Sequence, residues 1–313
     1  MTTNGLDFSI ITPVYNGDKY LEETLNSVFT HTKNIKYEHI VVNDGSNDKT
    51  TEILDKYKDK LVIINQPNAG QASAINKGLH AAEGRYSLIV NSDDPLITNE
   101  LFESSRMILD KNLDVVLTYP DWQIIDYQSK VTRTKHQREF SVIEFFGHSN
   151  CLVGPGGIFR TQTALRIGGW SSDYRFVPDY DFWLRLLAFG KFAHVPKVQA
   201  AWRNHQGSIS IQFRGKEMAD ERIRVIEDHI FRNQSLDVKL VNIARAFAYQ
   251  NAARLSYFTS AVKGRQLLWK SFLLYPKIII KQDIRITLFI LLLPFSRMLL
   301  KSGKRLFSAL SRF

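Results

Sequence analysis

Short apolar runs, rich in β-branched residues, alternate with longer amphipathic stretches through the first 120 residues. The runs have the length of strands, and the stretches between them repeat their apolar positions at helical spacing. The predicted strands are 8–14, 39–42, 61–64, 86–90 and 115–119. The predicted helices are 19–31, 72–82, 99–111 and one that Asn47 or Asp48 caps and that runs to about residue 57. Strands that alternate with helices predict an α/β fold with a mixed, mainly parallel sheet flanked by helices.

The pattern is less regular after residue 121. A turn is predicted at 128–130, a Gly-Pro-Gly-Gly loop at 154–157 and a helix at 180–189. Apolar positions recur at helical spacing from 236 to 258, which predicts a C-terminal helical extension.

Two adjacent carboxylates, Asp93 and Asp94, follow the fourth predicted strand and precede Pro95. Such a pair is costly to place together unless a cation or a hydroxyl group partners it. Carboxylate oxygens are preferred ligands of Mg²⁺ and Mn²⁺, which also bind diphosphate oxygens. The pattern therefore indicates a metal–diphosphate site, or else a solvated acidic turn that caps the following helix.

Two other polar turns follow strands. Asp44 comes after the second strand, and Gly45 allows close backbone approach, which suits hydrogen bonding to a base or ribose. An Asx turn leading into a helix explains Asp44 equally well. Residues 12–17 end the first strand in a similar turn, which could also be a plain connection.

Together these segments resemble the family-2 glycosyltransferases of the GT-A fold, over about residues 6–210. The matching segments occur in the family's order: TPVYNG (12–17), VVNDGSNDKT (41–50), NAGQASAINKGL (68–79), NSDD (91–94), PDYDFWLRL (178–186) and WRNHQGSIS (202–210).

The resemblance implies a site residue by residue. A nucleotide-sugar donor would be bound by Thr12, Pro13, Tyr15, Asp44, Asn76, Asp93 and Arg203. Tyr15 and Asp44 would hold the base and ribose, and Asp94 with His205 would bind the divalent cation, Mn²⁺ or Mg²⁺. UDP is the nucleotide expected from its frequency in the family.

Asp179 matches the family's general base, and direct attack by an acceptor activated by Asp179 would invert the anomeric centre. This chain departs from the family's pattern in two places. Pro178 stands where an acidic residue is frequent, and Asn91 stands where many relatives have Asp. Asp181 is predicted to be the N-terminal cap of the following helix.

The resemblance implies a catalytic domain over 1–235, with a nucleotide-sugar half (about 1–120) and an acceptor half (about 121–235). The expected reaction is sugar transfer to a glycan or lipid-linked saccharide during surface polysaccharide or glycoconjugate biosynthesis. A non-catalytic nucleotide-sugar or glycan-binding module with the same fold is the alternative. A dinucleotide oxidoreductase is disfavoured because neither GxGxxG nor a P-loop motif occurs.

All of the chain's net charge lies near its C-terminus. Residues 263–313 contain eleven Lys or Arg and one acidic residue, so their net charge of +10 equals that of the whole chain. A neutral body argues against nucleic-acid binding, and basic residues interleaved with Leu, Ile and Phe predict contact with an anionic membrane surface. The apolar run 286–293 is too short to span a bilayer.

Two alternatives for 236–313 are a helical cap packed on the catalytic domain and a homodimer interface. Cys151 is the single cysteine, and no secretory signal pattern begins the chain. We therefore expect a cytoplasmic enzyme attached peripherally to the inner face of the cell membrane.

Overall fold

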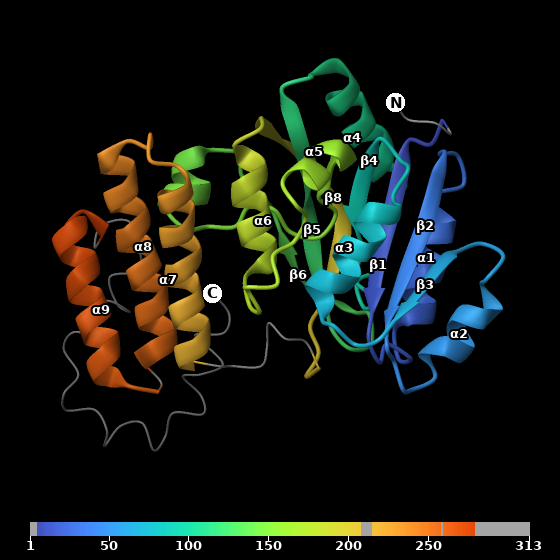
Figure 1. Ribbon diagram of the computed structural model, residues 1–313, viewed down its shortest axis with the longest axis horizontal. Coiled ribbons are helices and arrows are strands. Elements are labelled where there is room, and N and C mark those ends of the chain that lie inside the picture. Colours follow the sequence, from blue (N-terminus) through green and yellow to red (C-terminus); the bar gives the residue numbers. More distant parts are fainter. Residues whose placement is uncertain (1–4, 208–214, 258, 279–313) are drawn as a thin grey trace. The chain divides into compact units, whose positions relative to one another are not determined.

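The computed structural model describes residues 5–207, 215–257 and 259–278 (Figure 1). The chain divides into two compact units, each described by itself below. The first comprises Met1–Phe146 and Asn150–Phe213, and the second comprises Gly147–Ser149 and Arg214–Phe313.

The described residues of the first unit form an eight-stranded sheet. Its strands are β1 (Phe8–Val14), β2 (Tyr37–Asp44), β3 (Val62–Gln66), β4 (Tyr86–Ile89), β5 (Val115–Ile125), β6 (Val131–Lys135), β7 (Ile158–Arg160) and β8 (Lys191–Arg203). The order is β3-β2-β1-β4-β7-β5-β6, and β8 pairs with β5. Strands β1 to β4 run parallel, as do β5 and β8, whereas β7 is antiparallel to both of its neighbours. The predicted mixed, mainly parallel sheet is confirmed.

Helices cover both faces of this sheet. They are α1 (Leu21–His31), α2 (Thr50–Lys56), α3 (Gln71–Ala81), α4 (Glu100–Lys111), α5 (Thr161–Arg166) and α6 (Pro178–Leu187), with a short π-helix, η1 (Ile143–Gly147). Successive residues of β2 show how the faces are divided. Ile40 and Val42 pack with Ala74 of α3, whereas Val41 packs with Leu25 of α1 and with α2. Side chains alternate across a strand, so an unbroken apolar run needs helices on both sides.

The parallel strands β1, β2, β3 and β4 bring their carboxyl ends to one edge of the sheet. The turns that follow β1, β2 and β4 therefore gather there, although they are far apart in the sequence. This is where ligands bind in open α/β sheets.

The later part of the first unit differs from the prediction. Strand β5 continues to Ile125, and β6, β7 and β8 were not predicted. Strand β8 contains Lys197, Gln199 and an interior proline, Pro196, so it lacks the regular alternation that marks a strand. Helix α6 begins at Pro178, since proline suits the first helical position. Asp181 therefore lies inside the first turn, and its prediction as the helix cap is wrong.

The described residues of the second unit form three helices, α7 (Gly215–Arg232), α8 (Val238–Tyr257) and α9 (Ala261–Leu274) (Figure 1). Ala219 of α7 packs with Ala252 of α8 and Leu267 of α9. Helix α7 belongs to this helical unit, whose longer segment is Arg214–Phe313, and the division of the chain into domains 1–235 and 236–313 stays a prediction.

No helix among the described residues is both long and apolar enough to cross a bilayer. The apolar run 286–293 and most of the basic tail lie outside the described residues.

Candidate active site

The acidic loop after β4, residues 91–94, is hydrogen-bonded and carries one buried carboxylate, that of Asp94. Asp94 is 5% exposed. Its Oδ1 accepts a hydrogen bond from the Arg203 backbone N–H at 2.8 Å, and its Oδ2 accepts one from Asn91 Nδ2 at 2.9 Å. Burial, with the negative charge of Asp93 beside it, raises the pKa of Asp94 to about 8. An ionised Asp94 would therefore be stabilised by a nearby cation.

Asp93 is paired with a histidine from the segment after β8. His205 Nε2 lies 2.8 Å from Asp93 Oδ2, and the His205 ring packs on Tyr20 with centroids 5.0 Å apart. His205 Nδ1 accepts a hydrogen bond from the Gly207 N–H at 3.2 Å. Since Nδ1 is an acceptor, Nε2 carries the proton that is donated to Asp93. Both ring nitrogens are thus occupied in this arrangement, and a cation would have to displace one of these bonds.

Arg203 holds the acidic loop through hydrogen bonds from its backbone N–H and its guanidinium group. Its side chain has no exposed surface. The guanidinium donates hydrogen bonds to Asp93 O (2.8 Å), Asp126 O (3.2 Å), Ser129 Oγ (2.8 Å) and Glu23 Oε2 (2.8 Å). These bonds hold neighbouring loops together, so Arg203 positions the acidic loop, and the donor contact that the resemblance implies for Arg203 stays a prediction.

Asp44 at the end of β2 organises the loop that leads into α3. It is 3% exposed. Its Oδ1 accepts hydrogen bonds from Gln66 Nε2 (2.7 Å) and Ala69 N (2.9 Å), and its Oδ2 accepts one from Gly70 N (2.8 Å). A carboxylate oxygen accepts about two bonds, so Oδ2 retains capacity for one more donor.

The other predicted donor-binding residues differ in how much of each side chain is accessible. Thr12 is buried and its Oγ1 lies 2.9 Å from His39 Nε2, while Pro13 is also buried. Tyr15 is 51% exposed, so its ring is open to a ligand. Asn76 has a structural role, since its amide both accepts from Trp170 N (2.7 Å) and donates to Trp170 O (2.8 Å).

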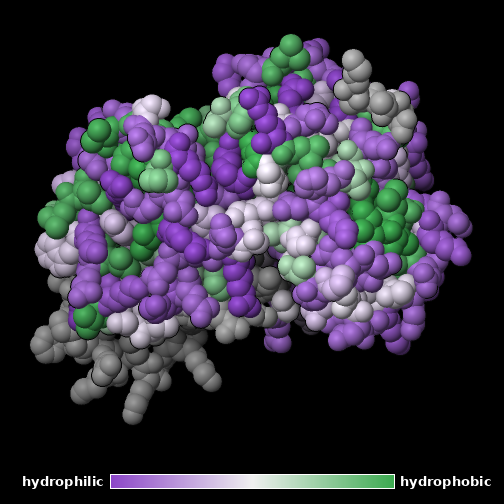
Figure 2. All heavy atoms as spheres, viewed as in Figure 1, coloured by the Kyte–Doolittle hydropathy of each residue, from purple (hydrophilic) through white to green (hydrophobic). Residues whose placement is uncertain are grey.

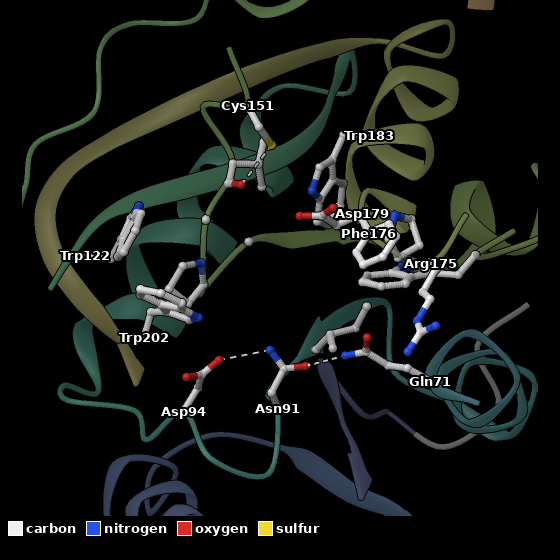
Figure 3. A pocket seen from close by; sticks show the side chains of 17 residues that line it. Gln71, Asn91, Asp94, Trp122, Cys151, Arg175, Phe176, Asp179, Trp183 and Trp202 are labelled. Atoms are coloured by element: carbon white, nitrogen blue, oxygen red, sulfur yellow. Dashed lines mark hydrogen bonds between the residues drawn. The ribbon is translucent and has the colours of Figure 1, made fainter. Parts of the chain in front are cut away.

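A cavity of about 360 Å³ opens beside Asp94. Asn91 and Gln71 line the cavity next to Asp94 (Figure 3). Asn91 Nδ2 donates a hydrogen bond to Asp94 Oδ2 at 2.9 Å, and Gln71 Nε2 donates one to Asn91 Oδ1 at 3.1 Å. Asp179 lies across the cavity from this row. The structure thus brings the two predicted key carboxylates, Asp94 and Asp179, to one cavity, although they are distant in the sequence.

Asp179 is placed by the first turn of α6. It is half-buried, and its Oδ1 accepts a hydrogen bond from the Tyr180 N–H at 2.8 Å. Further along the helix, Asp181 pairs with Arg185 at 2.8 Å, and Arg185 donates to two backbone carbonyl groups of the 167–169 turn. These bonds fix α6 and therefore the direction from which Asp179 approaches the cavity.

Comparison with known sequences agrees with this geometry. The profile described as "Glycosyl transferase family 2" matches residues 9–162. The chain belongs to this family. It is 29% identical to an uncharacterized glycosyltransferase of Rickettsia typhi, over 71% of this chain and 68% of that one. It is 34% identical to the poly(ribitol-phosphate) beta-N-acetylglucosaminyltransferase TarS of Staphylococcus aureus, over 36% of this chain and 20% of that one.

Solved structures show the same fold. The crystal structure of S. aureus TarS 1–349 in complex with UDP-GlcNAc matches with a TM-score of 0.58 and 17% identity, over 88% of this chain and 93% of that one. The mannosyltransferase PcManGT from Pyrobaculum calidifontis, in complex with GDP-Man and Mn²⁺, matches with a TM-score of 0.54 and 16% identity, over 100% of this chain and 82% of that one. The fold of this family-2 glycosyltransferase is therefore GT-A. The family and these neighbours together support a nucleotide-sugar glycosyltransferase.

The donor set around Asp94 fits a divalent cation held mainly by substrate. Within the described ranges, no three His, Cys, Asp or Glu side chains group as a complete ligand set. Mg²⁺ in nucleotide sites needs only one or two carboxylates, because phosphate oxygens and waters supply the rest. Each Asp94 oxygen accepts one protein hydrogen bond and keeps capacity for another ligand.

Several residues that line the cavity were not predicted from the sequence. They are Gln71, Trp122, Cys151, Arg175, Phe176, Trp183 and Trp202. Trp122 and Trp202 lie on strands whose extent the hydropathy pattern does not reveal. Gln71, Trp183 and Trp202 lie inside segments that carry the family resemblance, and that resemblance is the one signal in the sequence that points to them.

Proposed function

We propose that this protein is an inverting, metal-dependent glycosyltransferase that transfers a sugar from a nucleoside-diphosphate donor, UDP-linked, to a glycan or lipid-linked saccharide. The observation that supports this is the position of Asp94 and Asp179 on opposite sides of one cavity. Such a pair suits a displacement reaction, in which Asp94 would help to stabilise the leaving diphosphate and Asp179 would accept the proton of the attacking hydroxyl group.

At the donor end, Asp94 would hold the divalent cation, with Asp93 fixed beside it by His205. When bound, the cation would offset the charge that develops on the departing diphosphate. The exposed ring of Tyr15 and the remaining acceptor capacity of Asp44 Oδ2 would face the nucleoside.

At the acceptor end, Asp179 would take the proton of the attacking hydroxyl group. Attack from the side opposite the leaving group inverts the anomeric carbon in a single step. Pro178 precedes Asp179, so the acidic residue that often stands before the base in this family is absent here.

The test is donor turnover by the wild type and by Asp179→Asn, which is nearly isosteric but cannot accept the proton. We expect the rate to fall by about 10²-fold or more, while donor affinity, followed by thermal shift with UDP-, GDP- and dTDP-sugars and Mn²⁺, changes only slightly. Asp59→Asn, at an exposed position, is the control. Loss of donor binding with an unchanged saturating rate would show that Asp179 serves the donor and is not the base.

We also propose that the second unit attaches the enzyme to anionic membrane surfaces. On α9, Val262, Trp269 and Leu273 are exposed and lie on one helical face, because they are spaced seven and four residues apart. Basic residues flank this face on the same helix: Lys263, Arg265 and Lys270. In Figure 2, hydrophobic residues are interspersed with hydrophilic ones over the surface of these C-terminal helices. An exposed apolar face bordered by cations suits an interfacial helix.

A further inference from the structure

One wall of the cavity is aromatic and comes from two neighbouring strands, β5 and β8. These strands pair in parallel, with Trp122 opposite Ala200 and Ile124 opposite Trp202. Residues two apart on a strand share a face, so both indoles project from the same face of the sheet. Their ring centroids are 6.4 Å apart, and the rings stand at 85° to each other.

The two indoles differ from the other tryptophans of the cavity in being accessible. Trp170 and Trp183 are only 7% and 5% exposed, and Trp183 packs against Phe159. Trp122 and Trp202 are half-buried, so each keeps part of its surface open. Indole surface that stays open inside a cavity is available for contact with a ligand.

The backbone beside this wall is shaped to admit the indole. A Cβ at Gly154 would lie 2.4 Å from Trp122 Nε1, so a side chain at 154 would push the indole out of place. Gly154 of the 154–157 loop thus leaves the space that the Trp122 indole occupies.

The wall faces the predicted base. Figure 3 shows Trp122 and Trp202 on one side of the cavity and Asp179 and Trp183 on the other. Trp202 also precedes Arg203, whose N–H holds Asp94. A ring lying on the indoles would therefore be close to both carboxylates of the proposed reaction.

The charges on the acceptor side of the cavity favour a neutral ligand. Since Asp94 is assigned to the cation and the donor diphosphate, the charged lining residues that remain are Asp179 and Arg175, one of each sign. A neutral acceptor matches this balanced lining, whereas a phosphate-bearing one would bring a further negative charge next to the Asp179 carboxylate.

We infer that Trp122 and Trp202 bind the acceptor, and that the acceptor unit held there is a neutral pyranose. This inference rests on the proposed function and adds the chemical class of the acceptor to it. A pyranose presents C–H bonds on one face and hydroxyl groups around its rim. The C–H face packs on the electron-rich indole faces, and a rim hydroxyl points to Asp179. An acyclic polyol phosphate, the acceptor type in the name of S. aureus TarS, offers neither a flat C–H face nor a neutral charge.

The experiment is saturation-transfer NMR on the full chain with UDP and Mn²⁺ present throughout. The probes are methyl β-D-glucopyranoside, its N-acetylglucosamine analogue and D-ribitol 5-phosphate. We expect transfer to the C–H protons of one pyranoside face and little transfer to ribitol 5-phosphate. Trp122→Ala and Trp202→Ala should each reduce the pyranoside signal about five-fold or more, and Trp→Phe substitutions should restore part of it. Trp269→Ala, an exposed tryptophan of α9, should leave it unchanged.

Donor hydrolysis without acceptor separates this inference from the proposed function. The tryptophan variants are compared only where UDP with Mn²⁺ still stabilises them in a thermal-shift assay, so a lost pyranoside signal reports on the acceptor side. If wild type neither binds UDP nor hydrolyses a donor, the proposed function fails. If UDP binds but no pyranoside does, if ribitol 5-phosphate binds in its place, or if the pyranoside signal survives both alanine variants, the acceptor inference is wrong.

Discussion

The fully buried guanidinium of Arg203 donates a hydrogen bond to the partly exposed carboxylate of Glu23, with Nη2 and Oε2 2.8 Å apart. Ser129 joins the same cluster, because its Oγ accepts from Arg203 and donates to Glu23 at 2.7 Å. Ser129 has a φ of 65°, a left-handed backbone conformation that costs free energy for a residue with a side chain. Helix α1, the β5–β6 turn and the acidic loop are thus fixed through one arginine.

Glu23→Ala should impair catalysis although Glu23 does not line the cavity. Loss of a hydrogen bond to a charged group costs about 1.5–3 kcal/mol, and the loosened Arg203 would hold Asp93 and Asp94 less firmly. We expect a lower kcat and a higher Mn²⁺ requirement, with partial rescue by Glu23→Gln, which keeps one acceptor oxygen. Glu22→Ala, the neighbouring exposed acid paired with Lys56, is the control. Equal losses in both alanine variants would indicate a general effect on α1.

Asp94→Ala should abolish turnover and the thermal stabilisation that donor and Mn²⁺ confer together. The fold should persist, because the substitution removes a buried carboxylate whose charged form is disfavoured. Circular dichroism and Tm without ligand check the fold, and activity in EDTA checks the metal. Full activity in EDTA, or in the variant, would contradict the assignment of Asp94 to a cation.

His39 should make the first unit sensitive to acid. It is 1% exposed, and burial lowers its pKa to about 3 from an ordinary 6.5. Between these values the unfolded chain binds a proton that the folded chain does not, so stability is complete above pH 6.5 and falls as the pH drops towards 3. The slope should reach about 1.4 kcal/mol per pH unit.

Denaturant titrations of His39→Gln at several pH values should show a shallower loss of stability below pH 6.5 than the wild type. His80→Gln, at an exposed position, should keep the wild-type slope. A wild-type slope in His39→Gln would show that the acid sensitivity arises elsewhere.

Membrane attachment can be tested without disturbing the helical core. Leu267 and Leu268 of α9 are buried, so cutting the chain ahead of this helix would damage the second unit. The double variant Trp269→Ser, Leu273→Ser should weaken flotation with anionic liposomes, and wild type should detach partly at high salt. Phe231→Ser, at a 77% exposed aromatic residue of α7, should bind like wild type. Equal binding to neutral and anionic liposomes would contradict the electrostatic part.

The sequence predicted the first half of the fold well and the second half poorly, for physical reasons. Strands β1, β2 and β4 are buried on both faces, so they appear as continuous apolar runs with turn residues after them. Strand β8 carries Lys197 and Gln199 between apolar residues, and its pairing with β5 is a long-range contact that no local pattern records. Only tertiary structure could therefore reveal Trp122 and Trp202 as neighbours.

The candidate site shows a similar division. Asp94 and Asp179 were predicted to act together, and one cavity contains both. A sequence motif could not show which groups each side chain forms hydrogen bonds with. Asn76 and Arg203 both match family segments, yet their polar atoms bond to protein groups.

The bonds between Asn76 and Trp170 restrict how this enzyme can be recombined with its relatives. A Cβ at Gly169, which has a φ of 65°, would lie 2.2 Å from Asn76 Oδ1, so the amide fits only against a glycine. Asn76 lies in the predicted nucleotide-sugar half of the chain, and Gly169 and Trp170 lie in the predicted acceptor half. A chimera could exchange one half for that of another glycosyltransferase. It would keep this wall of the cavity in place only if Asn76, Gly169 and Trp170 all came from the same parent protein.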